Sequence, residues 1–267
     1  MSATTRGETI RDRFWLWGHE AGSHDSGYNL PTPSRMTPAE GAFYLGIPNL
    51  IMVRYDGRPA PPFARYAIPF RPLRQLVWSV VGAGGQTGEA EREEVLTLAK
   101  RMPNLTGVMM DDFFRAPSGD TGVGVLSCEE LRNLRSRLDR LGLWVVLYDY
   151  QLELPVRDHL ALCDRVTLWT WESRNLVNLE ANLDRAEALV PPGSLVLGCY
   201  LWDYGQKAPM PLAQMERQCE LGLRWLRQGR IQGMIFLASC IGDLELEAVE
   251  WTRQWIAAVG DQALTPA

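Results

Sequence analysis

The chain has 267 residues, of which 46% are hydrophobic and 22% charged. This composition supplies apolar material for one large core and argues against a largely disordered chain. The formal net charge of -5 argues against a general nucleic-acid-binding surface, and no apolar run has the length that a bilayer span needs. The five cysteines are odd in number and form no Cys-x-x-Cys. We therefore expect reduced thiols and a cytoplasmic protein.

Short apolar segments alternate with helical patterns along the whole chain. The predicted strands are residues 14–20, 49–55, 75–81, 105–114, 143–150, 165–172, 194–203 and 231–239. The predicted helices are residues 37–47, 63–74, 89–102, 127–141, 155–163, 175–190, 211–228 and 244–259. Thr37 with Glu40, and Ser127 with Glu130, have the spacing of capping boxes at two of these helix starts.

Eight strand–helix units predict a single (β/α)8 TIM barrel over residues 1–267, with residues 1–12 as a flexible N-terminal segment. The strands are apolar on both faces, as a parallel sheet requires, and the repeat has the size of a barrel unit. The rival architecture, a doubly wound sheet, usually carries a glycine-rich phosphate turn after its first strand. Residues 18–22 read Gly-His-Glu-Ala-Gly and lack that fingerprint.

Two adjacent carboxylates, Asp111 and Asp112, end the fourth predicted strand. An unpaired charge inside a strand is costly, so this position indicates a strand end that opens into a cleft. An ion pair with Arg54 or Arg115 is the structural alternative. Successive strand residues point to opposite faces, so we expect only one of the two aspartates to face the barrel mouth unless the strand bends there.

Acids and aromatic residues also follow most of the other predicted strands. Because barrel active sites lie at the C-terminal strand ends, we expect these side chains to gather on one face. Aromatic rings with polar edges suit sugar rings, and crowded carboxyl groups raise one another's pKa, which prepares a general acid. The expected substrate-binding residues are Trp17, His19, Glu20, Arg54, Trp78, Tyr148, Asp149, Trp171, Tyr200 and Trp202.

The chain resembles glycoside-hydrolase-type α/β barrels, and more closely bacterial barrel proteins that carry a Gly-x-x-x-Asp-Asp-Phe-Phe strand. The resemblance rests on residues 107–114, and more loosely on residues 17–24 and 236–240. It implies a carbohydrate-active hydrolase that uses paired carboxylates, with no cofactor and no metal. The chain lacks the Asp-x-x-Asp-x-Asp-x-Glu strand of chitinase-like families, so neither the sugar nor the stereochemistry follows from the resemblance.

The catalytic carboxylates are expected among Asp111, Asp112, Glu172 and Asp203. One strand-four aspartate needs a partner from another strand, and Glu172 and Asp203 are favoured over Glu20 because aromatic residues surround them. A helix-start acid is the structural alternative for Glu172, and a loop hydrogen bond is the alternative for Asp149.

Two other functions fit the same pattern. A metal-dependent sugar isomerase or epimerase would use His19, Glu20, Asp111 and Asp149 as ligands, although only three histidines occur in the chain. A non-catalytic carbohydrate-binding barrel would keep the aromatic wall without a close acid pair. In each case we expect a carbohydrate or glycoside as the ligand and no nucleic acid or membrane as a partner; the oligomeric state stays open.

Overall fold

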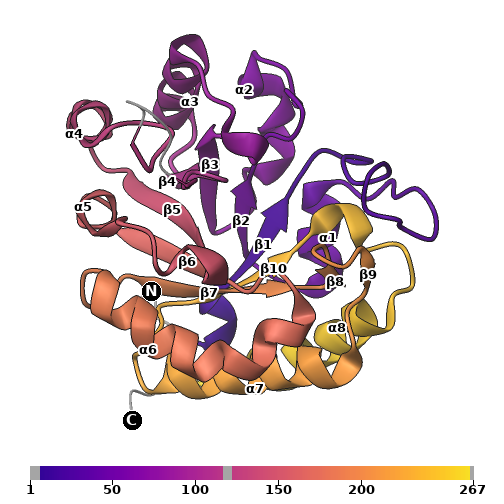
Figure 1. Cartoon of the computed structure of the whole chain (residues 1–267). Helices are drawn as coiled ribbons and strands as arrows, with labels where there is room; N and C mark the ends of the chain where they lie inside the picture. Colours follow the sequence, from indigo (N-terminus) through magenta and orange to yellow (C-terminus); the bar gives the residue numbers. More distant parts are fainter. Residues whose placement is uncertain (1–6, 117–121, 265–267) are drawn as a thin grey trace.

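The computed structural model describes residues 7–116 and 122–264. Eight parallel strands close into a barrel in the order β1-β10-β7-β6-β5-β4-β3-β2, with the helices outside it (Figure 1). The strands are β1 (Phe14–Gly18), β2 (Asn49–Met52), β3 (Gln75–Val81), β4 (Leu105–Met110), β5 (Gly142–Tyr148), β6 (Arg165–Trp169), β7 (Leu195–Tyr200) and β10 (Met234–Leu237). The predicted TIM barrel is confirmed.

The α-helices follow the strands in sequence. They are α1 (Pro38–Leu45), α2 (Phe63–Tyr66), α3 (Glu89–Arg101), α4 (Cys128–Ser136), α5 (Arg157–Leu160), α6 (Leu179–Leu189), α7 (Leu212–Arg227) and α8 (Glu247–Val259). Both predicted capping boxes form, at the starts of α1 and α4. The helix predicted over 63–74 is only one turn of α-helix followed by a short 3-10 helix, because prolines at 69 and 72 interrupt it.

Seven of the eight predicted strands end two to four residues earlier than the sequence pattern suggested, and at two of them this changes the place of a predicted catalytic acid. The segment 194–203 divides, because Trp202–Asp203 (β8) leaves the barrel and pairs antiparallel with Ala208–Pro209 (β9). Likewise β6 stops at Trp169, and a 3-10 helix begins at Ser173. The acids predicted at these two strand ends therefore lie on connecting segments.

Indole rings fill the barrel interior. Trp15 packs on Trp144 with ring centroids 5.0 Å apart, and Trp17 packs on Trp169 at 5.3 Å. Both contacts join β1 to strands across the barrel. Gly198 on β7 makes room for one of these rings, because a Cβ there would lie 2.0 Å from the Trp169 ring. The core packing thus depends on a glycine opposite a tryptophan.

The N-terminal segment predicted to be flexible is only partly described. Residues 1–6 lie outside the described residues. Beyond them, Thr9 forms a β-bridge with Ala263, and Ile10 begins a 3-10 helix and is fully buried. No helix in the ranges the structure describes combines the length and apolarity needed to cross a membrane.

Candidate functional site

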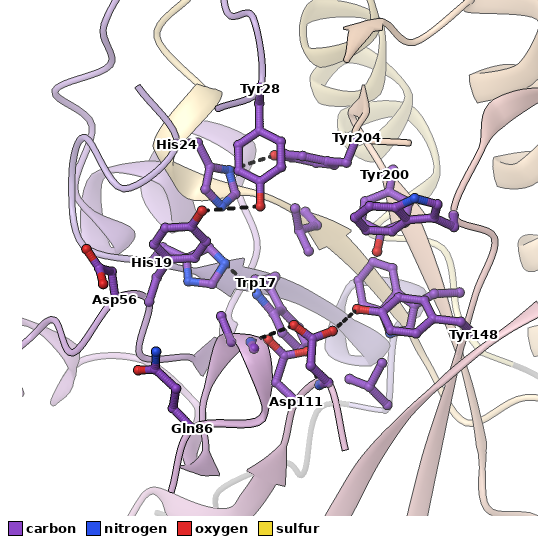
Figure 2. Close-up of a pocket in the computed structure, with 18 of the residues that line it drawn as sticks. Trp17, His19, His24, Tyr28, Asp56, Gln86, Asp111, Tyr148, Tyr200 and Tyr204 are labelled. Atoms are coloured by element: carbon purple, nitrogen blue, oxygen red, sulfur yellow. Dashed lines mark hydrogen bonds between the residues drawn. The ribbon is translucent and has the colours of Figure 1, made fainter. Parts of the chain in front are cut away.

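A cavity of about 450 Å³ opens at the C-terminal ends of the barrel strands. This size lies within the range of about 300–1,000 Å³ that small-molecule sites occupy. Its walls combine carboxyl groups, tyrosines and tryptophans (Figure 2). The lining residues are Trp17, His19, His24, Ser26, Tyr28, Tyr55, Asp56, Ala83, Gly84, Gln86, Asp111, Asp112, Val146, Tyr148, Trp169, Trp171, Tyr200, Tyr204 and Leu237.

Asp111 is a buried carboxyl group in this cavity. It follows β4 directly, and its backbone N–H donates to the Val81 carbonyl at the end of β3 (2.9 Å). Its side chain is only 5% exposed. Burial raises its pKa well above the usual carboxyl range, and the neighbouring Asp112 charge raises it further. Asp111 is therefore suited to hold a proton that an exposed aspartate would have lost.

Asp112 has a left-handed backbone conformation, with φ 44°. Its Oδ1 accepts a hydrogen bond from the Tyr148 hydroxyl (2.7 Å), and its Oδ2 accepts one from the Gly84 N–H (2.7 Å). Its own N–H donates to Asp111 Oδ1 (2.9 Å). Aspartate tolerates this backbone region better than most residues. Because the chain turns here, both aspartates line the cavity, which is the case that the expectation allowed for a bend at this point.

Four of the predicted substrate-binding aromatics lie together on the cavity wall. Tyr148 packs on Trp171 with ring centroids 5.7 Å apart, and Trp171 packs on Tyr200 at 5.9 Å. The cavity is also lined by Trp17 and Trp169, which pack on each other inside the barrel. The wall is therefore built directly on the barrel core.

His19 also lines the cavity, but both of its ring nitrogens are already used. Nε2 accepts a hydrogen bond from the Trp17 indole N–H (3.0 Å), so Nδ1 carries the proton that it donates to the Val53 carbonyl (2.9 Å). Burial lowers the His19 pKa to about 4, so the ring is neutral. Neither nitrogen offers a lone pair to a metal ion, and the described residues contain no group of three or more His, Cys, Asp or Glu placed to hold one.

Two predicted catalytic acids lie outside the cavity lining. Glu172 forms an ion pair with Arg174 (2.5 Å) at the start of the 3-10 helix that follows β6. Asp203 is buried and accepts hydrogen bonds from the backbone N–H groups of Ser173 and Gln206, both at 2.9 Å. Its oxygens connect two loops, which is the role of a structural carboxylate.

Two predicted substrate contacts support the wall from outside the lining. Asp149 accepts a hydrogen bond from the Trp171 backbone N–H (3.2 Å), and the Trp202 indole donates to the Tyr28 carbonyl (3.1 Å). Glu20 is likewise absent from the lining.

Arg54 and Trp78 point elsewhere. The Arg54 guanidinium donates to the Pro59 and Gly57 carbonyls and forms an ion pair with Glu91. Trp78 is fully buried and packs on Phe63, with ring centroids 5.1 Å apart, under the helices that cover the barrel.

The loop after β1 contributes residues that the strand pattern could not identify. Tyr28 is hydrogen-bonded by the Tyr55 hydroxyl (3.3 Å), and His24 Nδ1 lies 2.9 Å from the Tyr204 hydroxyl. Figure 2 shows His24 and Tyr28 at the opposite side of the cavity from Tyr148. Ser26 and Gln86 add polar side chains from loops. In the sequence, the only indication of these loop residues is that each lies in a loop that follows a predicted strand.

No protein-family model and no curated protein sequence matches the chain. Among solved structures, a chitinase from Chromobacterium violaceum is similar with a TM-score of 0.57 at 10% identity, over 92% of this chain and 99% of that one. The spore cortex-lytic enzyme SleL of Bacillus megaterium gives 0.59 at 11% identity, over 99% and 76%. Active domain 2 of a Pyrococcus furiosus chitinase gives 0.54 at 14%, over 87% and 85%. At these identities, the similarity establishes a shared barrel fold.

Proposed function

We propose that the chain is a carbohydrate-active hydrolase that cleaves a glycosidic bond in this cavity, with Asp111 as the general acid. The observation that carries the proposal is a buried carboxyl with a raised pKa beside a second carboxyl, in an aromatic-walled pocket. A carboxyl group that keeps its proton can donate it to the glycosidic oxygen as the bond breaks.

Asp112 takes the complementary role in this proposal. Its two oxygens accept hydrogen bonds from Tyr148 and Gly84, which fix its orientation. A carboxylate held in this way stabilises the positive charge that develops on the sugar ring in the transition state. Water then adds to the anomeric carbon and returns a proton to Asp111, which completes the hydrolysis. Tryptophan and tyrosine faces around the pair provide stacking surfaces for the sugar.

The structural neighbours support the same class. Two of the three are named as chitinases and the third as a cortex-lytic enzyme. The metal-dependent isomerase alternative loses a ligand, because the hydrogen bonds of His19 occupy both of its nitrogens. Glu172 and Asp203, which lie outside the lining, have no role in the reaction as we propose it.

The test is hydrolysis of a panel of aryl glycosides that differ in the leaving group. We expect Asp111→Asn to lower kcat on para-nitrophenyl glycosides by about 10²–10⁴-fold, the usual contribution of a general acid. Most of that loss should vanish on dinitrophenyl glycosides, whose leaving group departs without protonation. Asp112→Asn should slow both substrates, because charge stabilisation does not depend on the leaving group.

Glu172→Gln is the matched control, because it removes a nearby carboxylate outside the lining and should retain wild-type turnover. The acid assignment is lost if Asp111→Asn turns over para-nitrophenyl glycosides at the wild-type rate. The proposed function is itself refuted if the wild-type chain cleaves no glycoside in the panel.

A further inference from the structure

The cavity has an uncompensated negative charge. Among the described residues that line it, three are carboxylic acids (Asp56, Asp111 and Asp112) and none is lysine or arginine. Asp111 keeps its proton in the proposed function, so Asp56 and Asp112 supply the negative charge. The two lining histidines add no positive charge, because burial lowers the pKa of both His19 and His24. A ligand in this cavity therefore meets acids without a basic counterpart.

The arginine beside the cavity wall does not offset this charge. Arg54 directly precedes Tyr55, which lines the cavity, yet its guanidinium points into the loop after β2. There it donates to the Gly57 carbonyl (2.7 Å) and pairs with Glu91. A side chain held by these partners is not available to neutralise Asp112.

The carboxylates and the aromatic faces favour the same kind of ligand. Asp111 Oδ1 accepts the Asp112 N–H, and its other oxygen has no hydrogen-bond partner among the described residues. That oxygen belongs to a residue that is 5% exposed and lines the cavity, so it can hold the proton that the general acid donates, while Asp112 and Asp56 face the ligand as carboxylates. The π faces of Trp17 and Trp171 also attract cations. A positively charged sugar would satisfy both features.

We propose that the cavity takes an amino sugar with a free, protonated amine, a glucosamine-type residue, in preference to a neutral or acidic sugar. The inference rests on the proposed function in that it assigns the substrate class of the same site. Asp112 provides the charge nearest Asp111, and Asp56 provides a second carboxylate that lies apart from Asp111 in Figure 2. An acidic sugar would be repelled, because like charges in a partly buried site oppose binding.

The experiment compares trisaccharides matched in length by titrating the tryptophan fluorescence of the full chain. The ligands are the glucosamine trimer, the N-acetylglucosamine trimer, cellotriose and the galacturonic acid trimer. We expect the glucosamine trimer to bind at least about tenfold more tightly than cellotriose at low salt. This preference should decrease as salt is added, because salt screens charge interactions. The galacturonic acid trimer should bind most weakly.

Two variants test which carboxylates cause the preference for the glucosamine trimer. Asp112→Asn and Asp56→Asn should each reduce the ratio of glucosamine-trimer to cellotriose affinity by several-fold, and in Asp56→Asn the affinity for cellotriose should change little. Asp56 is exposed, so its variant still tests the inference if Asp112→Asn does not fold. Glu172→Gln should leave the ratio unchanged, because this carboxylate lies outside the lining.

The inference is overturned if cellotriose or the N-acetylglucosamine trimer binds as tightly as the glucosamine trimer, or if neither aspartate variant changes the ratio. These failures differ from failure of the proposed function. Cleavage of neutral glycosides without an amine preference would keep the hydrolase and refute the amino-sugar specificity. Preferential binding of the glucosamine trimer without cleavage of any glycoside would support the specificity and refute the hydrolase.

Discussion

Replacing Asp111 with asparagine should stabilise the fold at neutral pH while it removes the proposed acid. The folded-state pKa of Asp111 lies well above its ordinary value of 3.8, because the side chain is buried beside Asp112. Below that ordinary value the carboxyl is protonated in both the folded and unfolded states. As the pH rises, the carboxyl group of the unfolded chain loses its proton first. Folding then requires Asp111 either to take up a proton or to be buried as an anion, and both cost free energy. The free energy of unfolding therefore falls as the pH rises from the unfolded-state pKa to the folded-state pKa.

The magnitude follows from this proton linkage. Each pH unit between the two pKa values costs the wild type up to about 1.4 kcal/mol of unfolding free energy, and asparagine avoids that cost. Asparagine also keeps an oxygen that can accept the Asp112 N–H. We expect Asp111→Asn to exceed the wild type by about 1–2 kcal/mol at neutral pH, a common size for stabilising substitutions. For a domain of this size, each 1 kcal/mol changes Tm by about 2–4 °C.

The assay is urea unfolding followed by tryptophan fluorescence, across a pH series from acid to neutral. The difference in unfolding free energy between Asp111→Asn and the wild type should be near zero at the acid end, rise with pH and then level off. Asp56→Asn is the control, because it makes the same substitution at a lining carboxylate that is exposed. A difference that stays constant with pH, or that falls as pH rises, would refute the assignment of Asp111 as a proton-retaining buried acid.

Three further predictions concern the wall, the core and a loop. Tyr148→Phe removes a hydrogen bond to the Asp112 carboxylate worth about 1.5–3 kcal/mol, so kcat/KM on aryl glycosides should fall by about 10-fold to 100-fold. Gly198→Ala would place a Cβ 2.0 Å from the Trp169 ring, and thermal unfolding should show a loss of about 1–3 kcal/mol. Asp203→Asn should destabilise by about 1–3 kcal/mol in urea unfolding, because its amide nitrogen cannot accept an N–H, yet retain turnover per folded molecule.

Each of these predictions has a matched control or a contrary outcome. Tyr44→Phe also deletes a tyrosine hydroxyl bonded to a carboxylate, Glu250, but on the outer helices, so activity should not change. Gly88→Ala adds a Cβ with no atom within 4 Å, so it should not reproduce the loss at Gly198. Loss of turnover in folded Asp203→Asn would contradict a purely structural role for Asp203.

The sequence alone determined the barrel and the place of one acid pair. Alternating apolar strands and capped helices are local patterns, and eight repeats of such a unit fit a closed parallel sheet. The position of Asp111 and Asp112 was also predictable, because charged residues directly after a buried strand must leave the core. The sequence likewise predicted that Tyr148, Trp171 and Tyr200 lie together, because the C-terminal strand ends of one barrel meet on one face.

Only the tertiary structure decided which other residues share the cavity. The directions of Glu172 and Asp203 depend on where β6 and β7 stop, and the chain leaves both strands before reaching these acids. The left-handed turn at Asp112, which brings its carboxylate to the same side as Asp111, has no periodic signature. Tyr28 reaches the wall through a loop whose path depends on contacts with distant segments, such as the Trp202 indole. Strand periodicity predicts which residues of one strand share a face, whereas the conformation of a loop depends on the completed fold.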